Sequence, residues 1–168
     1  WEIGVDQKLA RDKVQVSATW FHANTKDFIQ NVVVGAMTQP QNLGRARRYG
    51  IETQADWFIT PRWTLSGNYT WLRSKVTDMG SAPPSGWVNG QPMPRRPNHT
   101  AAAILKYASD RWRGEARFTG VSSARDLDWS GYDQWNFVVG NVRVPGYCKL
   151  DLSLEYDILR NLTVTARG

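Results

Sequence analysis

The sequence predicts an all-β fold, an antiparallel wall of about eight strands from a transmembrane β-barrel. Apolar and polar residues alternate along several segments, which is typical of strands with one apolar face. The clearest segments have about ten residues, the length that a tilted strand needs to cross a bilayer, whereas strands of soluble sheets usually have about five or six. Short turns near residues 11, 61, 110 and 158 alternate with long loops near residues 35, 85 and 130. Sorting of connections by length is typical of outer-membrane barrels, which have short periplasmic turns and long extracellular loops.

The clearest predicted element is a hairpin within residues 50–74. Alternate residues of its two arms share an apolar face: Ile51, Thr53, Ala55, Trp57 and Ile59 on the first arm, and Trp63, Leu65, Gly67, Tyr69 and Trp71 on the second. The residues between them are mostly polar, and Pro61 marks the turn. The hairpin therefore has one apolar and one hydrophilic face.

Two strands are predicted before this hairpin, over residues 2–9 and 14–29. Glycine, proline and asparagine interrupt the alternation in residues 31–47, so a long loop is predicted there. The longest predicted loop covers residues 77–97, where Gly and Pro are frequent.

Four further strands complete the predicted eight: residues 100–107, 112–119, 148–156 and 162–166. A third long loop is predicted over residues 122–141.

The composition is compatible with a barrel. No stretch approaches eighteen apolar residues, so no membrane-spanning helix is predicted. The mean hydropathy is negative, but alternation halves the apolar content of a barrel strand. The 9 Trp and 6 Tyr suit bilayer interfaces.

The net charge of +6 comes from scattered Lys and Arg that form no continuous run, so no nucleic-acid partner is predicted. Cys148 is the single cysteine, which excludes an internal disulfide.

The predicted hydrophilic face is strongly charged. Its charged residues are Glu52, Asp56, Arg113, Glu115, Arg117, Lys149, Asp151 and Glu155. So many charges do not fit the packed interior of a small barrel, so this face is expected to meet water or polar protein.

Several short motifs, in this order, resemble the C-terminal barrel of TonB-dependent outer-membrane receptors. They are Lys26-Asp27-Phe28-Ile29, Gly50-Ile51-Glu52, Asn68-Tyr69-Thr70-Trp71, Arg96-Pro97-Asn98-His99, Val144-Pro145-Gly146-Tyr147 with Asp151-Leu152, and Asn161-Leu162-Thr163. The resemblance implies a barrel of 22 strands around an N-terminal plug, which imports siderophores, cobalamin or other scarce nutrients. Residues 1–168 would cover about the fourteenth to the twenty-first strand, without the plug, the earlier strands or the final strand.

The resemblance also implies a place in the bacterial outer membrane and a set of partners. These are membrane lipid and lipopolysaccharide, a small ligand of the siderophore or vitamin class, and the TonB protein, which would act through the absent plug. It implies no enzymatic activity.

Two groups of residues are candidates for ligand binding. Arg45, Arg47, Arg48, Arg95 and Arg96 end two predicted loops and could meet an anionic ligand or lipopolysaccharide phosphates, although solvated rim charges are the simpler interpretation. Aromatic loop residues could stack on a ligand, or could anchor in the interface or pack within the loops: Trp87, Trp129, Tyr132 and Trp135.

No catalytic residues, metal site or cofactor are predicted. Asp126, Asp128 and Asp133 do not match the spacing of a calcium loop. His22 and His99 are expected near a rim in structural roles, and Cys148 is expected to be an inert apolar side chain.

Two alternatives remain at this stage. One is a passive porin or a closed eight-stranded barrel, which the charged face and the ordered motifs do not favour. The other is a soluble, Trp-rich carbohydrate-binding module, which predicts a stable monomer in water with an exposed aromatic platform.

Overall fold

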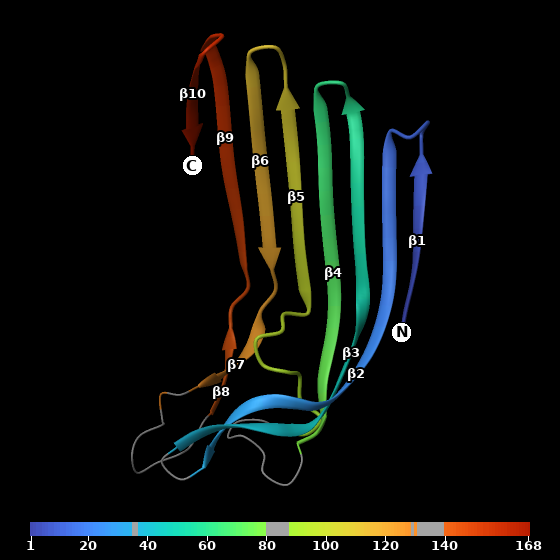
Figure 1. Ribbon diagram of the computed structural model, residues 1–168, viewed down its shortest axis with the longest axis vertical. Helices are drawn as coiled ribbons and strands as arrows, with labels where there is room; N and C mark the ends of the chain where they lie inside the picture. Colours follow the sequence, from blue (N-terminus) through green and yellow to red (C-terminus); the bar gives the residue numbers. More distant parts are fainter. Residues whose placement is uncertain (35–36, 80–87, 129, 131–139) are drawn as a thin grey trace.

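The computed structural model describes residues 1–34, 37–79, 88–128, 130 and 140–168. Eight antiparallel strands form one sheet in the order β1-β2-β3-β4-β5-β6-β9-β10, and two more form a separate ribbon (Figure 1). The strands of the sheet are β1 (Glu2–Leu9), β2 (Val14–Val34), β3 (Met37–Thr60), β4 (Trp63–Asp78), β5 (His99–Ala108), β6 (Trp112–Val121), β9 (Tyr147–Leu159) and β10 (Leu162–Arg167). The ribbon consists of β7 (Ala124–Asp128) and β8 (Gly140–Val144). The predicted all-β, antiparallel fold is confirmed.

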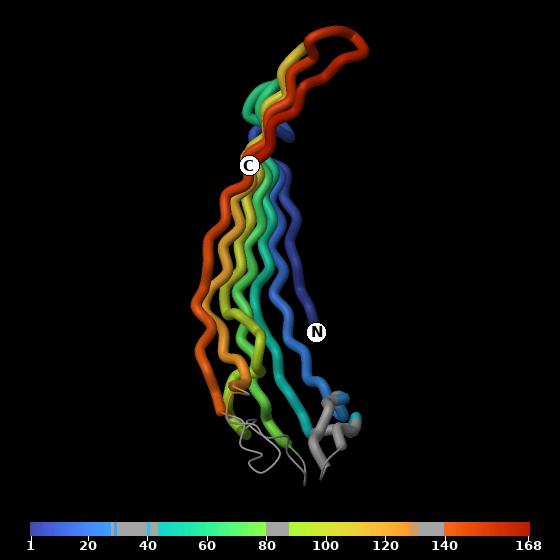
Figure 2. Tube along the Cα trace, turned by 90° about the vertical axis from the view of Figure 1, so that its left-hand side faces the viewer, coloured from blue at the N-terminus to red at the C-terminus, as the bar shows by residue number. Residues whose placement is uncertain are grey.

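The sheet is a single curved layer that is not closed into a barrel (Figure 2). Among the described residues, the buried apolar side chains are Ala46, Val76 and Met79, whereas large apolar residues such as Trp57 and Leu152 remain exposed. A soluble sandwich would cover one face with a second sheet, and the described strands have no such cover. The apolar face of the sheet therefore needs an apolar surrounding.

Strand pairing aligns like residues across the sheet. Counted from β1 to β9, one row on the apolar face contains Val5, Ala18, Thr53, Tyr69, Ala101, Gly120 and Cys148. A row on the opposite, polar face contains Lys8, Gln15, Asp56, Ser66, Ile104, Arg117 and Asp151. Because a slip by one residue would move every side chain to the other face, this separation of polarity fixes the register.

Successive connections lie at opposite ends of the sheet, as the sequence predicts. The turns after β1, β3, β5 and β9 lie at one end, here called the turn end, and the connections after β2, β4 and β6 lie at the other, the loop end (Figure 1). In the turn after β3, the Thr60 hydroxyl accepts hydrogen bonds from the backbone N–H groups of Arg62 and Trp63, at 3.2 and 3.1 Å. Pro61 lies between Thr60 and Arg62, so β3 and β4 are joined by a tight turn of two residues, Pro61 and Arg62.

The predicted long loop over residues 31–47 is wrong. β2 continues to Val34 and β3 begins at Met37, and the two form a ribbon that extends beyond the rest of the sheet and bends away from it (Figure 1). Pro40 pairs with Asn31 within this ribbon. Proline is tolerated there because β4 joins β3 only from Arg45 onward, so one side of the ribbon has no neighbouring strand in the described structure.

The predicted loop over residues 122–141 is also partly wrong, since it contains β7 and the start of β8. These strands pair from Ala124–Val144 to Asp128–Gly140. Each has only five residues, too few for alternation to distinguish a strand from a loop. Among the described residues, no helix has the length and apolar composition required to cross a membrane.

Candidate ligand-binding surface

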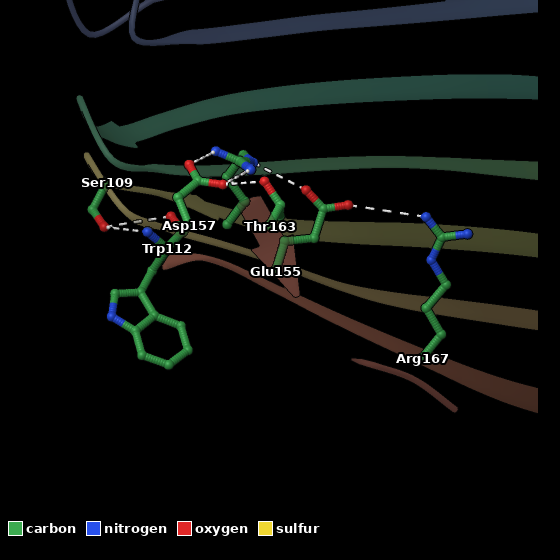
Figure 3. Close-up of polar contacts among 7 residues, drawn as sticks. Ser109, Trp112, Glu155, Asp157, Thr163 and Arg167 are labelled. Atoms are coloured by element: carbon green, nitrogen blue, oxygen red, sulfur yellow. Dashed lines mark hydrogen bonds and ion pairs between the residues drawn. The ribbon is translucent and has the colours of Figure 1, made fainter. Parts of the chain in front are cut away.

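A network of ion pairs covers the polar face at the turn end of β6, β9 and β10 (Figure 3). The Arg113 guanidinium donates two hydrogen bonds to the Asp157 carboxylate, both at 2.7 Å, and a third to Glu155 at 3.0 Å. Thr163 Oγ1 donates to Asp157 at 2.6 Å, and Arg167 lies 3.9 Å from Glu155. The indole of Trp112 points to the opposite side of the sheet from these groups (Figure 3). Alternation therefore places charge on one face and an aromatic ring on the other.

The polar face carries similar contacts toward the middle of the sheet. Glu115 pairs with Arg117 at 3.0 Å and with Lys106 at 3.9 Å, and Lys149 pairs with Asp151 at 2.6 Å. These side chains stay between about one third and two thirds exposed. Such a surface holds its charges in water or against a polar partner, and it would be unstable in hydrocarbon.

Hydrogen bonds to the Asp56 carboxylate lie on the same face, one between β3 and β4 and one within β3. Ser66 Oγ donates to Asp56 at 2.5 Å, and the amide of Gln54 donates to the other carboxylate oxygen at 3.1 Å. The carboxylate of Asp56 is thus held by two donors. Both halves of the polar face present fixed hydrogen-bonding groups.

At the loop end, the connection after β4 is linked to the β7–β8 ribbon. Arg95 Nε donates to the Asp126 carboxylate at 2.8 Å, and the backbone N–H of Arg95 donates to the carbonyl of Arg125 at 2.7 Å. Arg125 donates to Gln91 at 3.2 Å and to Asn141 at 2.7 Å. Two connections that are distant in sequence therefore form one structural unit.

The contact between Arg95 and Asp126 lowers the pKa of the Asp126 carboxyl. The hydrogen bond from Arg95 holds the pKa of the Asp126 carboxyl below its usual range, while desolvation acts in the opposite direction. A hydrogen bond from the Leu127 backbone N–H lowers the pKa further. Asp126 is consequently occupied by an internal cation. No cluster of His, Cys, Asp or Glu suitable for a metal ion is found in the described part of the chain, and Asp133, the third residue of the calcium hypothesis, lies outside it.

The structure separates the predicted arginines. In β3, Arg48 shares the polar face with Glu52 and Gln54, whereas Arg45 and Arg47 share the apolar face with Ile51 by alternation. All three are exposed. Arg95 is engaged by Asp126, and Arg96 is exposed beside it. Trp87, Trp129, Tyr132 and Trp135 lie outside the described residues, and their ligand contacts stay a prediction.

Two aromatic belts cross the apolar face, one near each end. The turn-end belt pairs Trp63 with Tyr107 and Trp112 with Tyr156, with ring centroids 4.8 and 4.4 Å apart. The loop-end belt contains Trp20, His22, Tyr49, Tyr69, Trp71 and His99. Here the Tyr69 hydroxyl lies 2.7 Å from His99 Nδ1. Composition alone suggests interface aromatics, but only the register places them in two rows, as in a membrane barrel.

Comparison with known proteins identifies the family. A family profile described as "TonB dependent receptor-like, beta-barrel" matches residues 1–168. The chain belongs to the TonB-dependent receptor family. A curated member, the probable TonB-dependent receptor BfrD of Bordetella pertussis, is 25% identical over 164 residues, which are 96% of this chain and 21% of BfrD. The chain thus spans about a fifth of the length of this relative.

Solved structures of this family share the fold. The ferric yersiniabactin uptake receptor FyuA from Yersinia pestis superposes with a TM-score of 0.72 at 21% identity, over 99% of this chain and 23% of FyuA. The pyoverdine outer membrane receptor FpvA from Pseudomonas aeruginosa PAO1, bound to pyoverdine, gives a TM-score of 0.73 at 12% identity, over 99% of this chain and 24% of FpvA. Members of the family are outer-membrane transport receptors and not enzymes. The membrane of this chain is therefore the outer membrane, and long connections such as those at its loop end are extracellular in barrels of that membrane.

Proposed function

We propose that residues 1–168 form part of the barrel wall of a receptor that imports a scarce nutrient across the outer membrane with energy from TonB. The observation that carries the proposal is the polar face, which continues across all eight strands of the sheet and holds charges in ion pairs from Lys106 to Arg167. A lumen that holds water and a polar plug requires such a wall. The segment would be the C-terminal part of a 22-stranded barrel, separate from the plug, the earlier strands and the final strand.

A ferric siderophore is the favoured nutrient class, with cobalamin as the second candidate. The names of the structural relatives FyuA and FpvA support the first class, since they are receptors for ferric yersiniabactin and pyoverdine. Arg48 and Arg96 lie exposed at the loop end and would meet an anionic chelate as it enters. TonB would contact the plug and not this wall.

Uptake by the full-length receptor tests the proposal. The gene is deleted in its host, and uptake of radioactive iron bound to catecholate, hydroxamate and mixed-ligand siderophores is measured beside uptake of labelled cobalamin. We expect the loss of one iron chelate, at least tenfold, with restoration by the intact gene only when TonB is functional. Loss of cobalamin uptake would move the receptor to the second class. Restoration that does not need TonB would support the passive-porin alternative and contradict the proposal.

A further inference from the structure

One arginine lies in each of the four turns at the turn end of the sheet. These residues are Arg11 after β1, Arg62 after β3, Arg111 after β5 and Arg160 after β9, and we name them the turn arginines. All four are exposed. Besides them, the turns contain the cation Lys13 and only two carboxylates, Asp12 and Asp110. The turn end therefore has an excess of positive charge.

The turn arginines differ from the arginines inside the strands. Arg113, two residues beyond Arg111, is held by Asp157 at 2.7 Å and by Glu155 at 3.0 Å. In the part of the chain that the structure describes, no turn arginine takes part in an ion pair. Each guanidinium carries five N–H donors in a fixed fork. These donors are free to meet anionic groups outside the chain.

An apolar side chain borders each turn arginine on the apolar face. In the same order along the chain, these side chains are Leu9, Trp63, Trp112 and Leu162, all of them exposed. Trp63 and Trp112 belong to the turn-end belt and directly follow Arg62 and Arg111. A spacing of one or two residues is about 3 to 7 Å along a strand. Because belts of Trp and Tyr lie at the level of lipid headgroups, the turn arginines lie at that level or slightly beyond it.

The register brings the four turns to one height in the membrane. Figure 1 shows them as a row that rises from the β1–β2 turn to the β9–β10 turn. Each hairpin extends past the previous one, because β3, β5 and β9 continue for three, one and three residues beyond Trp57, Tyr107 and Tyr156, the partners of the first residues of β2, β4 and β6. The row thus rises about 23 Å over six strand spacings of about 4.8 Å, a slope of about 39°.

This slope matches the tilt of the strands. Barrel strands tilt by about 35–45° from the membrane normal, so the tilt cancels the slope. The turn arginines then form a level row about 37 Å long. A level row of cations next to apolar and aromatic side chains is complementary to a planar layer of anionic headgroups. Short turns are periplasmic in outer-membrane barrels, so the facing layer is the periplasmic leaflet.

We propose that the turn arginines bind anionic phospholipids of the periplasmic leaflet at their phosphate groups. Guanidinium groups bind phosphate oxygens through bidentate, charge-assisted hydrogen bonds, and every cation close to an anionic lipid surface adds to the attraction. The row fixes the height of the barrel wall at this leaflet, with Trp63 and Trp112 on its hydrocarbon side. The proposal rests on the membrane placement of the chain and holds whichever nutrient is imported.

Photochemical labelling of the full-length receptor tests the site. The probe is phosphatidylglycerol with a photoreactive headgroup, added in trace amounts to receptor in phosphatidylcholine vesicles. The label is located by mass spectrometry after digestion with a protease that does not cut at arginine. We expect label in residues 9–14, 60–64, 108–113 and 158–163. R62Q/R111Q should lose at least tenfold of the label in residues 60–64 and 108–113, and R62Q or R111Q alone about fivefold in its own turn.

The control K8Q/R48Q removes two cations from the polar face. It should leave the label at the turns within twofold of the wild type, so it separates the row from an effect of net charge. A zwitterionic phosphatidylcholine probe with the same photoreactive group should label the turns at least fivefold less. Label that persists in R62Q/R111Q and in both single variants would overturn the proposal, and so would equal labelling by the two lipids.

Peptidoglycan is the other anionic partner that periplasmic turns could meet. Wild-type receptor and R62Q/R111Q should sediment equally with purified sacculi. Loss of this sedimentation in R62Q/R111Q with unchanged lipid label would assign the row to peptidoglycan and reject the lipid. Uptake assays keep the proposal separate from the proposed function, because TonB-dependent uptake by R62Q/R111Q should stay within twofold of the wild type while its lipid label falls.

Discussion

The ring of Phe21 lies directly over Gly50 across the β2–β3 ladder. A methyl group built on Gly50 would stand 2.9 Å from Phe21 Cζ and 2.1 Å from the carbonyl oxygen of Trp71. Gly50 is thus enclosed by a side chain on one strand and by the backbone of another. The sequence shows a glycine opening a strand pattern there, but the strand begins thirteen residues earlier, at Met37, and the glycine serves close packing.

Substitution of Gly50 is therefore expected to destabilise the receptor. G50A should lower the free energy of unfolding by about 1–3 kcal/mol, because the backbone of β4 cannot yield as a flexible side chain can. G114A is the matched control, since its added methyl group would meet Leu154 at an ordinary 3.7 Å, and it should be neutral or stabilising by up to about 1 kcal/mol. Urea titration of receptor in lipid vesicles measures both. Equal stability of G50A and wild type would show that β3 and β4 can separate freely.

The apolar face predicts that a charged side chain near its middle strongly lowers the stability of the folded barrel. Leu152 lies midway between Cys148 and Tyr156 in β9 and is half exposed. L152R should destabilise the folded barrel by about 2–4 kcal/mol. S153R, one residue further on the polar face, should cost less than about 1 kcal/mol. The same vesicle titration gives both values, and a similar cost for the two substitutions would contradict the assignment of the faces.

The bidentate contact between Arg113 and Asp157 predicts that the contributions of these two residues to stability are coupled. R113A leaves Asp157 without its cation and Glu155 with only Arg167, at 3.9 Å. It should therefore lower the melting temperature more than T163V, which removes one hydrogen bond to Asp157. R113K should restore only part of the loss, because an ammonium group cannot make the bidentate contact. A double-mutant cycle with D157A measures the coupling, and strictly additive effects would show that the pair is not energetically linked.

The contact between Arg95 and Asp126 predicts a dependence on pH. Since the folded-state pKa of Asp126 is depressed, its stabilisation is fully present above the unfolded value of about 3.9 and is lost as the pH falls through the lower folded value. At pH 7, D126N should raise hydrogen exchange in residues 88–98 about two- to fivefold, as expected for an exposed pair. The difference from wild type should shrink as the pH falls below the unfolded value and Asp126 becomes protonated. A difference that stays constant over this fall in pH would assign the effect to something other than charge.

Much of the fold follows from alternation alone. The strands around residues 51–71, 100–107 and 148–166 have long, regular patterns, so their faces and turns are predictable. The β2–β3 ribbon is not predictable, because Pro40 and Gly44 normally mark loops. Pro40 is tolerated here because β3 has one neighbouring strand at that point, and Gly44 has a positive φ where the backbone of Asp78 comes close. β7 and β8 are not predicted, because five residues are too few to show the alternation of a strand.

The candidate surface is predictable only in part. The charged face is visible in the sequence around Arg113 and Glu155, but the separation of Arg48 from Arg45 and Arg47 is not. It depends on counting alternate residues through a segment that the sequence presents as a loop. The two aromatic belts likewise need the pairing between strands, since Trp71 and His99 are adjacent only across the sheet.

The link between the two extracellular connections has a consequence for receptor diversity. Arg95 and Gln91 in one connection are fitted to Asp126 and Arg125 in the other, so neither can change its backbone path without strain on its partner. Selection for a new cargo would then act on both segments together. In a chimeric receptor, exchange of residues 79–98 alone should leave mismatched ends, whereas joint exchange with residues 122–146 transfers an intact module.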